Sequence, residues 1–188
     1  MLSTRKQLKF FIQMDEYALG RKYCFWKRND KVLVFQRILR KHEYYFNNKH
    51  RSVLHKLFNK YYGWRHTKLG YELGFDIPVN VFDYGLRINH WGLIVINPNT
   101  KVGAFCDIHQ GVNIGVQGKF YDDCPIIGNN VWIGPGAKLF GKIVIADDCQ
   151  IGANAVVNKS YVESGITIAG VPAKKISNNP NPYKRYMK

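Results

Sequence analysis

Aliphatic residues recur at every sixth position through the centre of the chain. One run of this period covers Ile96 to Ile114, and a second run, in a different phase, covers Ile127 to Val157. The ten positions are Ile96, Val102, Ile108, Ile114, Ile127, Ile133, Leu139, Ile145, Ile151 and Val157. The residue two positions earlier is usually small or β-branched, as at Cys106, Ala137 and Cys149. A helix needs a period near 3.6 and a half-buried strand a period of 2, so a fixed period of six predicts a parallel β-helix.

Each hexapeptide of such a coil forms one flat side and one corner. The aliphatic side chain fills the axis, three sides make a coil of about 18 residues, and successive coils stack about 4.8 Å apart. Phe82, Ile88 and Ile94 keep the same six-residue step, so the coils should begin shortly after Pro78. His90 then lies at a corner between two inward residues and faces outward.

Residues 1–75 follow a helical pattern instead. Apolar residues recur at spacings of three and four within 31–48 and 52–64, which predicts amphipathic helices. The remaining positions are rich in cations that we expect on an outer face: Arg37, Arg40, Lys41, Lys56 and Lys60. The histidines of this segment are also expected at the surface: His42, His50, His55 and His66. We therefore divide the chain into a basic helical segment (1–75), a β-helix domain (76–176) and a basic, extended or disordered tail (177–188).

Positive charge is concentrated before the repeats. Residues 1–75 hold 17 Lys and Arg against 5 Asp and Glu, a net charge of +12 out of +15 for the whole chain. Such a segment favours anionic partners, including a peripheral contact with a membrane surface. Nucleic acid is not expected, because the chain carries no recognisable reading motif.

No apolar run reaches the length of a membrane-spanning helix, and the N-terminus lacks the features of a signal peptide. The four cysteines form no C-x-x-C pair, and Cys106 and Cys149 fall in the inward column of small residues. Reduced thiols of this kind predict a cytoplasmic protein, and the basic segment would allow a peripheral contact with the inner face of a membrane.

Four segments of the chain resemble bacterial O-acetyltransferases of the hexapeptide-repeat superfamily, on the serine acetyltransferase-like branch. They are GLRINHWGLIVINPNTKVG from residue 85, IHQGVNIG from residue 108, IIGNNVWIGPGAKLFGKIVIADDCQIGANAVV from residue 126, and AGVPAKKI from residue 169. The resemblance covers about residues 70–176. It implies a mainly β protein, a left-handed parallel β-helix after an α-helical N-terminal segment. It also implies acetyl-CoA as co-substrate and a homotrimer with active sites between subunits.

The resemblance also implies roles for particular residues. His90 matches the catalytic base, which takes the proton from an acceptor hydroxyl, and Asp76 matches the carboxylate that orients it. Gly115, Pro135 and Ala153 would contact the pantetheine arm, and Lys174 would approach the CoA phosphates. The acceptor would be bound by Asn89, Trp91 and His109, although His109 could equally line the pantetheine groove or be an ordinary turn histidine.

Two departures from the pattern bear on the acceptor. Serine acetyltransferases carry an Asp where this chain has Asn89, and an Arg-His pair where it has Asp123 and Cys124. Because those groups hold the ammonium and carboxylate of serine, we expect a sugar hydroxyl as acceptor, as in enzymes that acetylate capsular and exopolysaccharides.

Three alternatives stay open. One is serine O-acetylation for cysteine biosynthesis, and another is a non-enzymatic β-helix that organises a complex. The third is a carbonic anhydrase-like zinc enzyme, which needs three converging histidines. Only His90 and His109 lie in the coils, so we expect no metal.

Overall fold

The computed structural model describes residues 2–24, 29–118 and 123–180. Three helices come first: α1 (Arg5–Leu19), α2 (Lys31–Asn47) and α3 (Val53–Leu73). Each begins at a side chain that caps its backbone amides, namely Thr4, Asp30 and Ser52. The third helix runs nine residues beyond the predicted 52–64 and stops at Gly74, which adopts the left-handed conformation.

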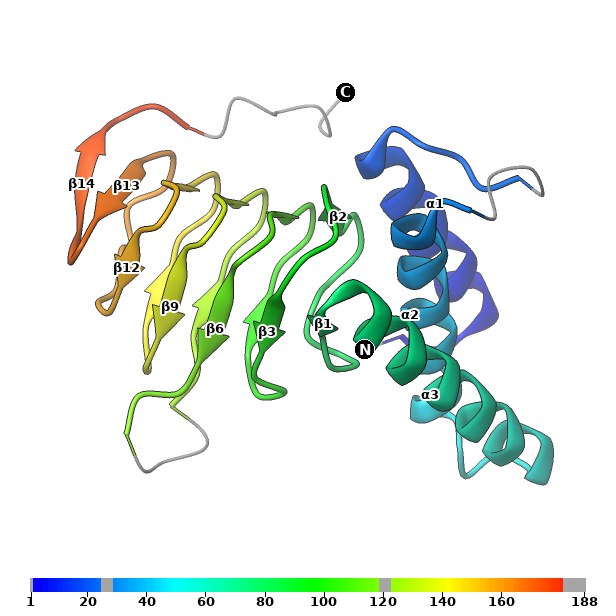
Figure 1. The fold of residues 1–188 in the computed structure, drawn as a ribbon. Helices are drawn as coiled ribbons and strands as arrows, with labels where there is room; N and C mark the ends of the chain where they lie inside the picture. The colour runs from blue at the N-terminus through cyan, green and yellow to red at the C-terminus, as the bar shows by residue number, and fades with distance from the viewer. Residues whose placement is uncertain (1, 25–28, 119–122, 181–188) are drawn as a thin grey trace.

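Short strands follow and stack into three sheets that form the sides of a parallel β-helix (Figure 1). The first sheet contains β1 (Phe75–Asp76), β3 (Ile94–Ile96), β6 (Asn113–Gly115), β9 (Lys138–Phe140) and β12 (Val156–Val157). The second contains β4 (Lys101–Val102), β7 (Ile126–Ile127) and β10 (Val144–Ile145). The third contains β2 (Arg87–Ile88), β5 (Asp107–Ile108), β8 (Trp132–Ile133), β11 (Gln150–Ile151), β13 (Thr167–Gly170) and β14 (Ala173–Ser177). All pairings among these strands are parallel except that of β13 with β14.

The six-residue period is the core of this coil. All ten periodic aliphatic residues are buried, and so are the small residues two positions before them, including Cys106, Ala137 and Cys149. Strand register confirms the stacking, because Ile108 pairs with Ile133 and Ile133 with Ile151 on successive coils. The predicted hexapeptide β-helix with N-terminal helices is therefore confirmed.

The helices pack on the first coil through a buried ionic network. Arg40 is fully buried and donates hydrogen bonds to Asp15 of α1 (2.7 Å) and Glu43 of α2 (2.9 Å). It also donates to the backbone oxygens of Phe82 (2.9 Å) and Asp83 (2.6 Å) at the start of the coil. The prediction that Arg40 lies on an outer basic face is wrong, because its guanidinium joins three parts of the fold.

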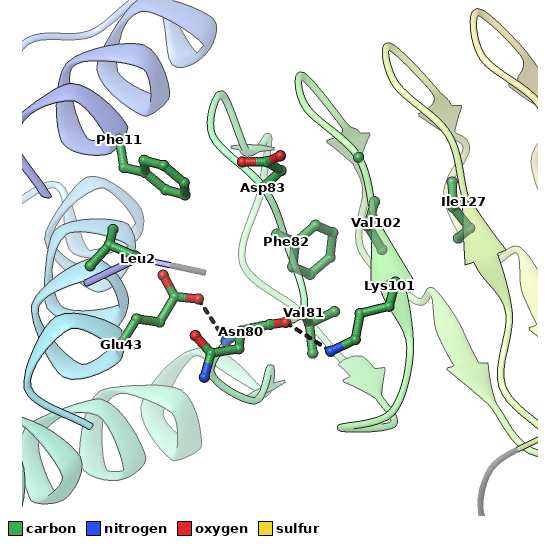
Figure 2. Close-up of a pocket in the computed structure, with 11 residues that line it drawn as sticks. Leu2, Phe11, Glu43, Asn80, Val81, Phe82, Asp83, Lys101, Val102 and Ile127 are labelled. Atoms are coloured by element: carbon green, nitrogen blue, oxygen red, sulfur yellow. Dashed lines mark hydrogen bonds between the residues drawn. The ribbon is translucent and has the colours of Figure 1, made fainter. Parts of the chain in front are cut away.

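A pocket of about 500 Å³ lies at the same junction and contains none of the predicted site residues. Figure 2 shows Glu43 and Lys101 directed toward Asn80 between the helices and the coil. The Glu43 carboxylate accepts from the Asn80 amide (2.9 Å), and Lys101 donates to the Asn80 carbonyl (3.3 Å). These contacts fix the entry of the chain into the first coil.

One predicted surface histidine is also buried. His66 of α3 packs on Phe35 of α2, and its Nδ1 lies 3.0 Å from Nδ1 of the half-buried His42. Burial lowers the pKa of His66 to about 4. The surface prediction for His66 is wrong, because α3 turns its histidine and glycine face toward α2.

The described helices include none that is both long and apolar enough to cross a bilayer. The predicted tail is described only as far as Pro180, and its remainder lies outside the described residues. The same holds for residues 119–122 of the segment between the two phases of the repeat.

Candidate active site

His90 lies at an exposed corner just after β2, as the period predicts. It lines a pocket of about 510 Å³ between the first coil and the helices. Asn89 and Trp91 line the same pocket, so the structure brings these three predicted residues together. Trp91 is 72% exposed, which leaves its ring available to a ligand.

Two ion pairs from the helical segment complete this pocket. Arg21 lies 3.0 Å from Asp30, and Lys31 lies 3.1 Å from Glu72. The pocket therefore presents both carboxylates and cations beside the imidazole of His90. These four residues were not identified from the sequence, because the position of the helices and of the α1–α2 connection against the coil is set by the tertiary structure.

A chain of polar side chains continues from Asn89 to the next coil. Asp107 is almost fully buried, accepts a hydrogen bond from Arg87 (3.0 Å), and accepts another from the Asn89 side-chain amide. Asn89 also lies 3.1 Å from Nε2 of His109, which stacks beside it as the coil spacing predicts. Asp107 and Arg87 were not identified from the sequence, although their pairing in strand register could have revealed them.

Among these hydrogen-bonded side chains, His109 is neutral at pH 7. Burial lowers its pKa to about 4, helped by the positive charges of Arg87 and His90. Its Nε2 lies 3.5 Å from the Asp107 carboxylate, but the low pKa means that no ion pair forms at neutral pH. The ring packs edge-on against Trp132 (5.1 Å) and is thereby held in place.

Three of the four predicted CoA contacts lie along the coil edge that carries His90. Pro135 and Ala153 follow β8 and β11 at the same corner on successive coils, and the Pro135 carbonyl accepts from the Asn154 amide (2.9 Å). Lys174 on β14 is exposed and pairs with Ala169 of β13 at the far end of this edge. Gly115 ends β6 on the opposite border of the first sheet, away from the other three.

Asp76 lies elsewhere. It is exposed on β1 and lines a separate pocket together with His42, His66 and Tyr71. The hydrogen bonds among the described residues include none between Asp76 and His90. The described residues also contain no cluster of three His, Cys, Asp or Glu side chains that could hold a metal.

Besides Asn89, two further positions where this chain departs from the serine acetyltransferase pattern lie just before β7. Cys124 is buried there and Asp123 is half-buried. Neither residue lines the pocket of His90 within this chain.

Comparison with known proteins relates the coil to acetyltransferases. Residues 124–159 match the family model described as bacterial transferase hexapeptide (six repeats). Serine acetyltransferase from Helicobacter pylori strain J99 is 44% identical over 94 residues, which are 50% of this chain and 54% of that protein. The chain spans about half the length of the curated relatives it matches.

Solved structures agree with this relationship over nearly the whole chain. A serine acetyltransferase from Brucella abortus in complex with coenzyme A has a TM-score of 0.70 at 26% identity, covering 94% of this chain and 70% of that one. A Neisseria gonorrhoeae serine acetyltransferase in complex with serine has a TM-score of 0.69 at 26% identity, covering 92% and 70%.

These findings correct the acceptor predicted from the sequence. The matched relatives and structures are serine acetyltransferases. The prediction of polysaccharide O-acetylation is therefore wrong, and the alternative of serine O-acetylation is better supported. The prediction relied on Asn89, Asp123 and Cys124 and overlooked the charges that the helices add beside His90. Residues 124–159 therefore match a bacterial transferase hexapeptide model, and the fold as a whole is similar to that of serine acetyltransferases.

Proposed function

We propose that this protein is an acetyl-CoA-dependent O-acetyltransferase whose acceptor is the hydroxyl of L-serine. The observation that carries the proposal is the pocket of His90, which places a histidine between two ion pairs in a fold similar to serine acetyltransferases. Histidine is the side chain that most often acts as a general base in enzymes.

The charges of the pocket support an amino-acid acceptor. A free amino acid carries an ammonium and a carboxylate, which require an anion and a cation on the protein. Glu72 and Asp30 supply carboxylates, and Arg21 and Lys31 supply cations. A neutral sugar carries no charge of its own to pair with these groups.

The coil edge fits the extended arm of acetyl-CoA. From His90 to Lys174 it crosses five strand spacings, about 24 Å in total. The side-chain oxygen of Gln110, on this edge one coil beyond His90, is buried and has no hydrogen-bond partner among the described residues. An amide N–H of the pantetheine arm would donate to it, while the Lys174 ammonium would lie near the CoA phosphates.

Acetyl-CoA supplies the acetyl group as a thioester. In the proposed reaction His90 takes the proton from the serine hydroxyl as the oxygen attacks the thioester carbonyl, the carbon–sulfur bond breaks, and the proton passes to the sulfur. Asn89, held by Asp107 and lying beside His109, fixes the backbone next to His90. In this proposal Asp76 is the carboxylate that would orient His90, although it lines a separate pocket of this chain.

The predicted homotrimer of left-handed coils is part of this proposal. Gly115 lies across the first sheet from Pro135 and Ala153. In a trimer with ligands held between subunits, Gly115 of one copy would face the Pro135 edge of the next. Analytical ultracentrifugation should give three times the mass of one chain, and a monomer with full activity would contradict this arrangement.

The central experiment measures release of CoA thiol from acetyl-CoA with L-serine and detects O-acetylserine by mass spectrometry. We expect serine-dependent release, and His90→Ala should lower kcat by about 10²- to 10⁴-fold. CoA binding, measured by calorimetry, should survive in this variant. His50→Ala is the matched control, because His50 is an exposed histidine of the helical segment.

A second variant addresses the acceptor. Glu72→Gln keeps the shape of the side chain but removes its charge, so KM for serine should rise about tenfold while KM for acetyl-CoA stays unchanged. CoA binding without serine-dependent release would reject serine as the acceptor. Full activity of His90→Ala would reject the assigned base.

A further inference from the structure

The outer face of α3 exposes a row of large apolar side chains. Its members are between 43% and 75% exposed and recur at helical spacing: Val53, Leu54, Leu57, Phe58, Tyr61 and Trp64. We call these six residues the α3 stripe. Figure 1 shows that α3 runs outward from its end near β1, so this part of the helix lies away from the coil.

In an ordinary surface helix the large apolar residues face the core, whereas in α3 they face outward. The face that packs on α2 and β1 carries Gly63, His66 and Gly70, where a side chain on Gly70 would come within 2.6 Å of the Phe75 carbonyl oxygen. The large apolar residues therefore turn outward. An exposed apolar patch of this kind marks an interaction surface rather than a stability element.

Positive charge accompanies the stripe, and Glu72, which lines a pocket together with Trp64, is already paired with Lys31. Residues 44–71 contain six Lys and Arg and no Asp or Glu. Two of these cations lie over rings of the stripe itself: Lys68 is 5.4 Å from the centre of the Trp64 ring, and Arg65 is 5.9 Å from that of Tyr61.

Exposed apolar side chains flanked by cations favour one kind of binding partner over another. A second copy of the same helix would bring together the lysines and arginines that flank the two stripes, and like-charge repulsion opposes this contact. An anionic bilayer instead takes up Leu, Phe, Trp and Tyr at its interface and attracts Lys and Arg to its headgroups. We propose that the α3 stripe docks the protein on the surface of an anionic phospholipid membrane.

The test is co-sedimentation of the full chain with vesicles of phosphatidylcholine containing 30% phosphatidylglycerol, compared with vesicles of phosphatidylcholine alone. We expect binding to the anionic vesicles, weakened by salt, and little binding to the neutral ones. Lys56→Gln/Lys60→Gln should reduce partitioning about 25-fold, at about fivefold per cation. Leu57→Gln/Trp64→Gln should reduce it at least tenfold.

Val162→Gln/Lys142→Gln is the matched control, because it changes one exposed apolar residue and one exposed lysine on the coil. It should bind vesicles as the parent does. Thermal unfolding followed by circular dichroism checks that every variant is folded. Trp64 supplies an independent readout, since its fluorescence should shift to the blue on vesicle binding and this shift should be absent in Trp64→Phe.

Absence of vesicle binding by the folded parent would overturn the proposal, as would equal binding by the parent and the stripe variants. A change of oligomeric mass in the stripe variants without vesicle binding would assign the stripe to a subunit interface instead. Vesicle binding and acetyl transfer are measured separately, so failure of one leaves the other intact.

Discussion

At the residue scale, hydrogen bonds to neighbouring side chains order the candidate site around His90. His90 is an exposed corner histidine, and its setting comes from Asn89, which is held in turn by the buried carboxylate of Asp107. Asp107 also binds Arg87, so one carboxylate orders two side chains of the preceding coil. We therefore assign Asp107 a positioning role.

Asp107→Asn should reduce kcat/KM for serine about 10- to 100-fold, because a hydrogen bond to a charged group contributes about 1.5 to 3 kcal/mol. CoA binding should persist, since Pro135, Ala153 and Lys174 lie on later coils than Asp107. Steady-state kinetics with both substrates checks this, with Glu163→Gln as an exposed control on the coil. Unchanged kinetics in Asp107→Asn would contradict the positioning role.

His66 makes a separate prediction about pH. Its pKa is about 4 in the folded protein against 6.5 for an ordinary histidine. A lowered folded pKa contributes stability that is present above pH 6.5 and is lost as pH falls toward 4. Replacing His66 by Gln should flatten this loss by up to about 1.4 kcal/mol per pH unit.

The measurement is urea unfolding of the parent and His66→Gln at several values between pH 7 and pH 4. The exposed His50→Gln serves as control and should follow the parent. His109 and His42 have the same sign of shift and remain in both proteins, so the difference between the two curves reports on His66 together with its contact to His42. Parallel curves would show that His66 titrates normally.

At the scale of the element, each hexapeptide contributes one inward aliphatic residue to a continuous core. Ile133 on β8 lies between Ile108 and Ile151 on the neighbouring coils and is fully buried. Ile126 on β7 has the same side chain but is 55% exposed. Substitutions at Ile133 and Ile126 remove the same side chain, so a difference between their effects reports on burial alone.

Ile133→Ala should lower the free energy of unfolding by about 2 to 5 kcal/mol, because it removes buried methylenes and leaves a cavity. Ile126→Ala should cost about 0.5 kcal/mol or less, as surface substitutions usually do. Chemical denaturation of both variants checks the comparison. Similar losses at the two sites would mean that the coil is not packed around this axis.

At the scale of the whole molecule, the helices and the coil are joined through Arg40. Burial raises the pKa of Asp15 to about 6, even though the Arg40 guanidinium beside it lowers that pKa. Because the folded pKa lies above 3.8, the contribution of Asp15 to stability is fully present below pH 3.8 and is lost as pH rises through 6. The Arg40 guanidinium is the counter-charge that allows Asp15 and Glu43 to be buried as carboxylates at neutral pH.

Arg40→Met should lower the free energy of unfolding by about 3 to 5 kcal/mol at pH 8, because two buried carboxylates lose their counter-charge. The loss should be smaller at pH 5, where a neutral carboxyl is more readily buried. Denaturation at both pH values checks this, and Lys175→Met, which breaks an exposed pair, should cost less than about 1 kcal/mol. An equal loss at both pH values would contradict the charge-based account.

The sequence alone predicted the coil, because the six-residue period is a local pattern and each repeat buries its own aliphatic residue. It also placed His90 at an outward corner and His109 beside Asn89, since stacking follows from the length of one coil. The burial of Arg40 and His66 needed the tertiary structure, because helical periodicity does not reveal which face meets a neighbour.

The charges around His90 were likewise decided only by the tertiary structure. Arg21, Asp30, Lys31 and Glu72 are distant from His90 along the chain and reach its pocket through the packing of helices on the first coil. The same packing turns the glycine and histidine face of α3 inward and leaves its apolar stripe outside. A repeat is encoded residue by residue, whereas the contact of one element with another depends on their relative placement in space.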